Sequence, residues 1–541
     1  MLFLPVAASA QTKPPIREYI AKTWDTLTRS TTDCKSLVDP KVTTEPVLYL
    51  PADIVTPPEI TTLKQKCKVD VRRLPRVIHR EGDVRPEELK TPGLLYLPHP
   101  YVVPGGRFNE QYGWDSYFIV LGLISDGRLE LARGMVDNFL FEIEHYGALL
   151  NANRTYYLTR SQPPLLGEMI REVHAEYTRQ AAHNTGNGKQ FDPARPALHG
   201  DDQWLQHAYV TAKRDYALWR TADHKAGDTG LARYYDVGDG PVIEMADDST
   251  YYPDAIRWMV AHPAEGKQYL VPTSAGDNAS CDKAQSKVCA AAEVNGTRLT
   301  HDFYKGDRAM RESGFDTSFR FGAFSGGTHH FAPVCLNSLL YRYETDMASL
   351  ATELGRTEEA ATWTQYAATR RTAINKYLWD EALGGFYDYN FTTGERSTYR
   401  YATTFYPIWA GAASSHQVAL LATDTLPKLL RPHGLTMSDQ ATGMQWDMPY
   451  MWAPTVYFAA EGLKTASRTA DARAIAGRYV ETVQDNFVRE GTLREKYNAD
   501  TGTTETPLAA GYRSNNAGFG WTNGVYLRLL PLVSPEVRPI P

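Results

Sequence analysis

Residues 104–118 bring together the side-chain types that a carbohydrate pocket needs. The stretch reads Pro-Gly-Gly-Arg-Phe-Asn-Glu-Gln-Tyr-Gly-Trp-Asp-Ser-Tyr-Phe, and its paired glycines let the backbone approach a ligand closely. Arg107 offers a forked donor, Trp114 an apolar face for a sugar ring and Asp115 an acceptor. The same residues would also fit a tight turn closed by a buried Arg–Asp pair. Taken alone, the stretch leaves both interpretations open.

Three further segments combine aromatic, amide and basic side chains in a similar way. They are residues 151–164 (Asn-Ala-Asn-Arg-Thr-Tyr-Tyr-Leu-Thr-Arg-Ser-Gln-Pro-Pro), 445–454 (Gln-Trp-Asp-Met-Pro-Tyr-Met-Trp-Ala-Pro) and 518–524 (Gly-Phe-Gly-Trp-Thr-Asn-Gly). Together with residues 104–118 they resemble the signature segments of the trehalases, glycoside hydrolase family 37. The resemblance implies an all-α fold, an (α/α)6 toroid whose long loops form the active-site pocket.

The resemblance also assigns a pair of reacting carboxyl groups. Cleavage of a glycosidic bond usually needs one protonated carboxyl and one carboxylate. Residues 312–320 (Glu-Ser-Gly-Phe-Asp-Thr-Ser-Phe-Arg) resemble the family's general-acid segment, and residues 491–498 (Gly-Thr-Leu-Arg-Glu-Lys-Tyr-Asn) its general-base segment. This match makes Asp316 the general acid and Glu495 the general base. Taken alone, Glu495 would be interpreted as a helix-end residue paired with a neighbouring Lys or Arg.

The match carries further expectations about the site. The family is inverting, which implies that the two carboxyl groups lie roughly 6.5–9.5 Å apart with a water between them. Phe315 would raise the pKa of the acid by desolvation, whereas Arg320 would lower it if it lay close. The residues expected to contact the disaccharide are Arg107, Phe108, Trp114, Asp115, Asn151, Arg160, Ser161, Gln162, Glu244, Gly314 and Trp446.

The sequence departs from the family pattern at three places. Tyr450-Met451 stand where the family has Asn-Gly. The family's Arg-Pro-Glu segment corresponds to residues 241–244, where Glu244 is kept and the Arg is lost near Val242. Residues 501–512 lack the glycine run of the family's lid, and Glu505 could replace the lid glutamate. These changes leave the predicted acid and base in place. They weaken the inference about which sugar the site binds as the leaving group.

The function that the resemblance implies is hydrolysis of α,α-trehalose to two glucose molecules. The departures keep open a second function, that of an exo-acting α-glucosidase on another α-linked glucoside. A third is a non-catalytic trehalose-binding protein on the same scaffold. Retention of both carboxylates argues against the third.

Composition excludes several other classes of function. The 541 residues are 43% hydrophobic and 22% charged, with a formal net charge of −6 and no Lys/Arg run, so a nucleic-acid binder is excluded. No stretch is basic and amphipathic, or long and apolar, as a membrane protein requires. The 33 Tyr and 11 Trp suit either carbohydrate or a large core with half-buried Tyr. We expect a monomer that acts on a small disaccharide.

The N-terminal part differs in composition from the rest. Residues 1–10 end in Ala8-Ser9-Ala10, which fits the cleavage site of a secretory signal, although the basic start of such a signal is missing. We therefore expect a signal-peptide remnant and a periplasmic or secreted location. Residues 11–75 are rich in Pro and Thr, and they are predicted to wrap around a catalytic domain formed by residues 76–541.

Five cysteines occur in the chain. In an oxidising compartment Cys34 could pair with Cys67, and Cys281 with Cys289. Cys335 lies in an apolar run and is predicted to be a buried free thiol.

Few side chains have the spacing of metal ligands. None of the cysteines has the CxxC spacing of a zinc site. His329 and His330 are adjacent, so they could not share a helix face, and no third ligand lies at helical spacing from them. We expect neither a metal nor a cofactor.

Helical periodicity dominates from about residue 76. Leu129, Val136 and Phe139 fall on one face of a helix that starts near residue 127. Strand patterns are few and short, and the helices are separated by long loops rich in Gly, Pro and aromatic residues, where functional groups usually lie. Such paired helices favour a toroid. Further helices are predicted at 203–219, 333–354, 357–378, 416–430, 453–466 and 470–488.

Overall fold

Six helices form a closed inner ring in the part of the chain that the structure describes. In this computed structural model each helix packs against the next, and the last returns to the first. The order is α4 (Gly113–Ser125), α6 (Leu166–Gly186), α12 (Val334–Glu353), α14 (Tyr406–Ala410), α17 (Ala453–Thr465) and α19 (Gly520–Val533). The described residues are 15–38, 45–186, 199–247, 250–275, 288, 291–509 and 514–533.

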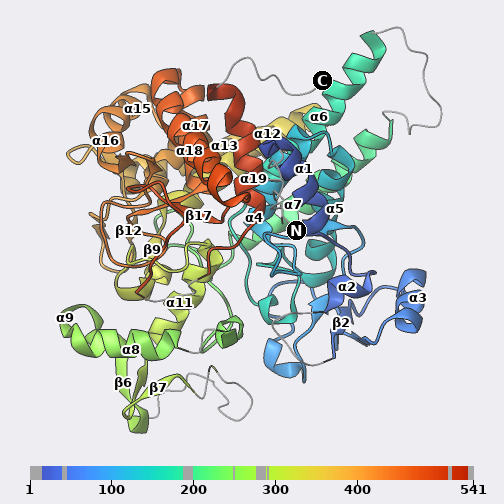
Figure 1. The fold of residues 1–541 in the computed structure, drawn as a ribbon, viewed down its shortest axis with the longest axis horizontal. Helices are drawn as coiled ribbons and strands as arrows, with labels where there is room; N and C mark the ends of the chain where they lie inside the picture. Colours follow the sequence, from blue (N-terminus) through green and yellow to red (C-terminus); the bar gives the residue numbers. More distant parts are fainter. Residues whose placement is uncertain are drawn as a thin grey trace, which may run out of the picture.

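A second layer of helices covers this ring from outside (Figure 1). Four outer helices pack on the inner helix that precedes them in the chain: α5 on α4, α7 on α6, α13 on α12 and α18 on α17. A fifth, α1, packs against α19, and α15 and α16 follow α14. The predicted (α/α)6 fold is thereby confirmed. The bounds are α1 Ile16–Leu27, α5 Leu129–Tyr146, α7 His199–Leu218, α13 Thr357–Ala373, α15 Ser415–Leu420, α16 Leu426–Leu429 and α18 Thr469–Glu490.

The hydrophobic pattern separates the two layers. The first eleven residues of α4 are all buried, from Gly113 to Leu123. A helix that is apolar on all sides belongs in the interior of a protein, and α4 lies in the inner ring accordingly. In α5 the predicted stripe of Leu129, Val136 and Phe139 is buried, while residues between these positions are partly exposed.

One predicted helix is interrupted. The segment predicted as a single helix at 416–430 consists of α15, a π-turn over Leu421–Thr425, and α16. Pro427 lies in the first turn of α16. Proline has no amide hydrogen, so it cannot donate the hydrogen bond that would continue the preceding helix. This loss accounts for the break.

The ring closes at a contact between α4 and α19 that only glycine permits. A Cβ atom on Gly122 would lie 2.6 Å from the Cα atom of Gly524. A Cβ atom on Gly524 would lie 2.0 Å from the carbonyl oxygen of Phe118. Both distances are far below van der Waals contact, so the two backbones approach this closely because neither glycine has a side chain.

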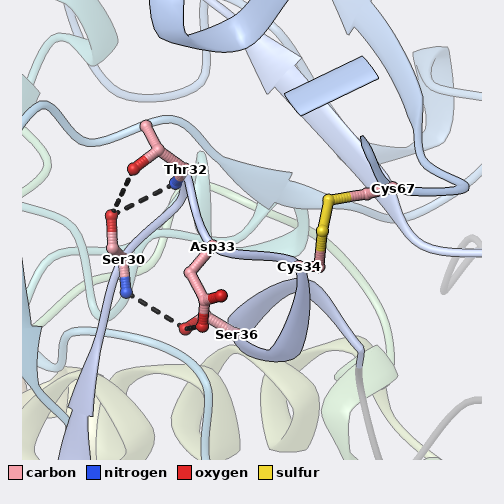
Figure 2. The surroundings of a disulfide bond; sticks show 6 residues. All are labelled: Ser30, Thr32, Asp33, Cys34, Ser36 and Cys67. Carbon is pink, nitrogen blue, oxygen red and sulfur yellow. Dashed lines mark hydrogen bonds between the residues drawn. A yellow bond between two sulfur atoms is a disulfide. The ribbon is translucent and has the colours of Figure 1, made fainter. Parts of the chain in front are cut away.

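The N-terminal residues form a small layer beside the barrel. A disulfide bond joins Cys34 to Cys67 and so ties α2 to the end of α3, which confirms that predicted pairing (Figure 2). The parallel sheet has the order β3-β2-β4, and β1 pairs with β5. The domain boundary at residue 75 stays a prediction. The bounds are β1 Thr28–Arg29, α2 Cys34–Leu37, β2 Val47–Leu50, α3 Pro58–Lys66, β3 Asp70–Arg73, β4 Leu94–Leu95 and β5 Tyr101–Val102.

A long excursion between α7 and α12 projects away from the barrel (Figure 1). It has its own hydrophobic cluster, which includes Tyr251, Tyr252 and Phe303. Its last helix, α11, returns the chain to the barrel. The elements are α8 Tyr251–Ala261, α9 Pro263–Gly266, β6 Leu270–Pro272, β7 Glu293–Val294, β8 Thr297–Leu299 and α11 His301–Ser313.

The remaining strands are short and lie in the loops. Cys335 is a buried free thiol, as predicted, whereas Cys281 and Cys289 lie outside the described residues. Of the helices described, none combines the length and the apolar character needed to cross a bilayer. The strands are β9 Phe331–Ala332, β10 Trp379–Asp380, β11 Gly385–Phe386, β12 Tyr389–Asn390, β13 Glu395–Arg396, β14 Leu430–Arg431, β15 Gly434–Leu435, β16 Tyr450–Trp452 and β17 Lys496–Asn498.

We predict that Gly524→Ala destabilises the protein, because the added methyl would overlap the Phe118 carbonyl. Overpacking of this kind costs about 1–3 kcal/mol, and thermal unfolding followed by circular dichroism should show a lower Tm. Gly477→Ala is the matched control, because a Cβ at that position on α18 meets nothing within 4 Å. The control should match or exceed the wild-type Tm, since alanine favours a helix over glycine. Equal Tm values for Gly524→Ala and wild type would contradict the close contact.

Candidate active site

A pocket lies at the end of the barrel where α4 and α19 begin. The walls come from the loops before these helices and from those that carry the predicted acid and base. Twelve predicted residues line the pocket: Arg107, Phe108, Trp114, Asp115, Asn151, Arg160, Gln162, Glu244, Gly314, Asp316, Trp446 and Glu495.

Asp316 follows α11 and faces the pocket with about a third of its side chain exposed (33%). Burial raises the pKa of this carboxyl to about 6, and the nearby cations Arg311 and Arg160 act in the opposite direction. Arg311 Nη1 lies 3.5 Å from Asp316 Oδ2. Arg320 is not the cation beside Asp316, because it forms a buried bidentate pair with Asp388 at 2.7 and 2.6 Å.

Arg311 is itself held in place from behind. Its guanidinium donates two hydrogen bonds to Asp307, each of 3.2 Å. The hydroxyls of Tyr251 and Tyr252 donate to the same carboxylate at 3.0 and 2.7 Å. A buried cation needs such partners, since desolvation without them would be costly. The position of Arg311 relative to Asp316 is therefore fixed by the core of the excursion.

Glu495 lies just before β17 and is buried, with 2% of its surface exposed. Its Oε2 accepts a hydrogen bond of 2.9 Å from Asn516 Nδ2. Its backbone carbonyl accepts 3.0 Å from the indole of Trp521, and its amide donates 3.0 Å to the Asn516 carbonyl. The carboxylate is thus oriented from both the side chain and the backbone.

Gln445 links the segments of the two carboxyl groups. Its Nε2 donates to the backbone carbonyl of Asp316. Its Oε1 accepts a hydrogen bond of 3.3 Å from Lys496 Nζ, next to Glu495 in the chain. The pairing of β16 with β17 places Trp452 opposite Lys496 in the same region. One amide side chain therefore contacts both catalytic segments.

Three tryptophans that line the pocket pack together with the buried ring of Phe315, and we call the four side chains the aromatic floor: Trp114, Phe315, Trp446 and Trp521. The ring of Trp114 lies 5.4 Å from that of Phe315 and 5.8 Å from each of the other two. Gly314 fits against the floor, where a Cβ would lie 2.7 Å from Trp114 Cε2. The floor gives the pocket an apolar surface of the kind that a sugar ring can stack on.

Arg160 forms the opposite wall. Its Nη2 donates to Asn151 Oδ1 at 2.9 Å and also to Glu244. Its Nη1 lies 3.5 Å from Asp236, and its guanidinium lies 4.9 Å from the ring centre of Tyr157. The residues predicted to grip a sugar are thus joined to one another before any ligand is present.

Gln162 and Ser161 differ in their relation to the pocket. Gln162 lines it, and its Oε1 accepts a hydrogen bond of 2.8 Å from the amide of Trp114. Ser161 does not line it. The hydroxyl of Ser161 donates 2.6 Å to the Leu149 carbonyl, and its amide donates 3.2 Å to Glu312. These hydrogen bonds give Ser161 partners inside the protein, and its predicted contact with substrate stays a prediction.

Asp115 is a third carboxyl group in the pocket. It is almost fully buried, at 5% exposure. Burial raises its pKa well above the ordinary value, and the charges of Glu495 and then Asp316 act in the same direction. Three acids that share one desolvated space favour the protonated form of some of them.

Eight lining residues were missed by the sequence prediction. Each lies in or directly beside a segment that was recognised, so position along the chain was available as a signal. What the sequence lacked was the direction of each side chain, which is set by packing. These residues are Pro104, Tyr112, Tyr156, Tyr157, Met245, Arg311, Phe519 and Trp521.

None of the described residues at which the sequence departs from the family pattern is among those that line the pocket. Val242 is buried, and its amide donates 3.0 Å to the Tyr252 hydroxyl. Glu505 is exposed and is not among the residues that line the pocket. Tyr450 reaches the 501–512 segment, where its hydroxyl donates to the Pro507 carbonyl. Residues 510–513 of that segment lie outside the described residues.

An (α/α)6 barrel whose pocket holds carboxyl groups, arginines and an aromatic floor defines a glycoside hydrolase. The sequence profile of the trehalase family matches residues 6–534. The chain therefore belongs to the trehalase family.

Individual relatives agree with this assignment. A probable trehalase of Eremothecium gossypii is 35% identical and aligns with 93% of this chain and 70% of its own. The cytosolic neutral trehalase of Saccharomyces cerevisiae is 32% identical over 91% of this chain and 67% of its own. The solved structure of a neutral trehalase from the same yeast superimposes with a TM-score of 0.75 at 31% identity, covering 96% of this chain and 94% of that one.

The predicted signal peptide and periplasmic or secreted location are contradicted. Five relatives that cover 91–95% of this chain are named cytosolic neutral trehalases, against one named periplasmic that covers 81%. The prediction was wrong because it relied on the small residues at positions 8–10 alone. Residues 1–10 lie outside the described residues.

We predict that Arg311→Gln raises the pKa of Asp316, because it removes the cation that favours the carboxylate. The alkaline limb of the pH profile of kcat/KM reports a group that must stay protonated. This limb lies at about pH 6, and in the variant it should lie at a pH higher by about one unit. Arg311→Lys keeps the charge and serves as the control. Arg311 also lines the pocket, so both variants should lose activity, and the limb position is the measurement. If the alkaline limb lay at the same pH in Arg311→Gln and Arg311→Lys, the charge of Arg311 would not be what lowers the pKa of Asp316.

Proposed function

We propose that Asp316 and Glu495 hydrolyse α,α-trehalose by inversion, as general acid and general base. Hydrolysis of trehalose to two glucose molecules follows from membership of the trehalase family. The roles of the two carboxyl groups are supported by their common pocket and their different surroundings. The observation that carries the assignment is that Asp316 and Glu495, from the two segments that resemble the family's acid and base segments, line one pocket.

Asp316 is suited to donate a proton. With its pKa raised to about 6, a useful fraction of this carboxyl is protonated near neutral pH. A carboxyl with an ordinary pKa near 4 would be almost fully ionised there. Asp316 would transfer its proton to the bridging oxygen as the bond to the anomeric carbon breaks. The departing glucose then leaves as a neutral alcohol and not as an alkoxide.

Glu495 is suited to accept a proton from water. Its Oε2 is oriented by the hydrogen bond from Asn516, and Lys496 Nζ lies 3.8 Å away. In an inverting enzyme the base activates a water on the face of the sugar opposite the leaving group. The new C–O bond then forms with inverted configuration, and the proton lost by water goes to Glu495.

The remaining pocket residues would hold the two glucose units. The aromatic floor would stack against a ring, and the linked group of Arg160, Asn151 and Glu244 would bind hydroxyls. The other candidates are less favoured: an exo-acting α-glucosidase for another α-glucoside, and a trehalose-binding protein without activity. Glucose release from trehalose, compared with kojibiose and maltose, distinguishes them. The predicted monomeric state stays a prediction.

Asp316→Asn and Glu495→Gln should each lose about 10²–10⁴-fold in kcat for trehalose, because a general acid or base contributes about this much. The control is Glu358→Gln on the exposed surface of α13, which should retain wild-type kcat. Circular dichroism should show native folding in all three. A kcat near the wild-type value in Asp316→Asn or Glu495→Gln would contradict the catalytic role proposed for that residue.

The two roles can be separated with α-D-glucosyl fluoride. Fluoride leaves without protonation, so the variant that lacks the acid should hydrolyse this compound far better than trehalose. Glu495→Gln should stay impaired on both substrates, because water must still be activated. If Glu495→Gln hydrolysed the fluoride well and Asp316→Asn did not, Glu495 would be the general acid and Asp316 the general base.

The stereochemistry provides an independent prediction. At early times proton NMR should show equal amounts of α- and β-glucose from trehalose, since one unit is inverted and the other departs unchanged. Separate integration of the two anomeric signals before mutarotation gives the ratio. Release of α-glucose alone would indicate retention and a covalent intermediate.

A further inference from the structure

A second group of titratable side chains lies behind the wall of the pocket. Glu81, His224 and Glu312 come from three distant segments and meet in the interior, where their exposures are 7%, 0% and 0%. His224 Nε2 lies 3.5 Å from Glu312 Oε1 and 3.9 Å from Glu81 Oε1. One donor atom from each residue lies within 4.8 Å of the other two. We call this group the buried triad.

The tautomer of His224 follows from its neighbours. Its Nδ1 lies 3.1 Å from the Thr221 hydroxyl oxygen. That hydroxyl gives its own hydrogen to the Leu218 carbonyl at 2.8 Å. The hydrogen between His224 and Thr221 must therefore belong to Nδ1. In neutral His224 this leaves the lone pair of Nε2 directed toward two carboxyl groups.

Hydrogen bonds and basic side chains leave part of this arrangement unbalanced. Among the described residues, His224 Nε2 and Glu81 Oε2 make no hydrogen bond. No lysine or arginine forms an ion pair with Glu81 or Glu312 in the described part of the chain. Three electron-rich groups thus face one point.

The spacing fits a common cation better than a shared proton. A charge-assisted N–H···O bond is about 2.7–2.9 Å long, which is shorter than the 3.5 and 3.9 Å separations from His224 Nε2. Ligands about 2.1 Å from a tetrahedral ion lie about 3.4 Å from one another. Two carboxylates and a neutral imidazole carry a charge of −2, which a divalent ion would neutralise.

We propose that the buried triad of Glu81, His224 and Glu312 binds a divalent cation of the Zn²⁺ type. The imidazole ligand favours Zn²⁺ over Mg²⁺ or Ca²⁺, which prefer oxygen. Thr221 is the outer partner that orients the imidazole, as is usual for metal-bound histidine. This site goes beyond the glycosidase function proposed above.

The cation would brace the active site from behind. Glu312 also accepts hydrogen bonds from the amides of Ser161, at 3.2 Å, and Tyr235, at 2.6 Å. Ser161 lies between Arg160 and Gln162, both of which line the pocket. Glu312 lies on α11, which leads to Asp316. Fixing Glu312 would therefore fix both segments.

A second group offers a contrast. Asp302, His329 and His330 also bring three donor atoms together, which sequence spacing did not indicate. The two imidazoles lie 3.0 and 3.2 Å from the same oxygen of Asp302, so hydrogen bonds explain their positions. Asp302 is about half exposed (49%). This group serves as the control.

The test measures zinc in the full chain produced without a polyhistidine tag. The protein is refolded with Zn²⁺ alone or Mg²⁺ alone, desalted and analysed by inductively coupled plasma mass spectrometry. Wild type and His330→Gln should retain about one Zn²⁺ per chain and no Mg²⁺. His224→Gln and Glu81→Gln should lose the Zn²⁺. In wild type, Zn²⁺ should also raise the Tm relative to protein refolded with EDTA.

Two results would overturn the site. Folded wild type that takes up no Zn²⁺ would mean that the buried triad does not bind such a cation. Zinc that persists in His224→Gln and disappears in His330→Gln would move the site to the exposed group. Should the triad variants not fold, the zinc content and Tm of wild type and His330→Gln still decide between these results.

Discussion

The contact between Trp114 and three other aromatic rings holds the pocket together. Trp114 begins α4, Phe315 precedes Asp316, Trp446 lies in the loop before α17, and Trp521 begins α19. The four come from segments separated by up to 407 positions, from residue 114 to residue 521. Each aromatic pair contributes about 0.5–1.5 kcal/mol beyond its buried area. The same packing orients the Glu495 backbone through the indole of Trp521.

The floor is stable because the barrel closes tightly beneath it. Gly122 and Gly524 let α4 and α19 approach closely, which brings Trp114 and Trp521 together at their first turns. Around this apolar base the charged groups are paired rather than isolated. Arg311 is held by Asp307, Arg320 by Asp388, and Arg160 by several acids. Buried charges without partners would be too costly to keep at these positions.

Helix α11 connects the pocket with the interior behind it. Arg311 faces Asp316, while Glu312, the next residue, faces the buried triad. Neighbouring residues on a helix point in different directions. Consecutive residues of α11 therefore contact the pocket on one side of its wall and the buried triad on the other. Val242 and Glu505, two of the departures from the family pattern, are not among the residues that line the pocket. Val242 still contacts the group that holds Arg311, because its amide donates to the Tyr252 hydroxyl.

The sequence by itself determined the helical architecture and most of the pocket. Periodicity marks the helices, because an apolar face repeats with the helical turn. Local segments identify Arg107, Asn151 and Glu495, because each of these residues lies in a continuous motif. Only the tertiary structure decided which cation lies beside Asp316, since Arg311 and Arg320 are equally plausible along the chain. It also placed Ser161 behind the wall and brought Glu81 to His224, because side-chain direction and long-range contacts are set by packing.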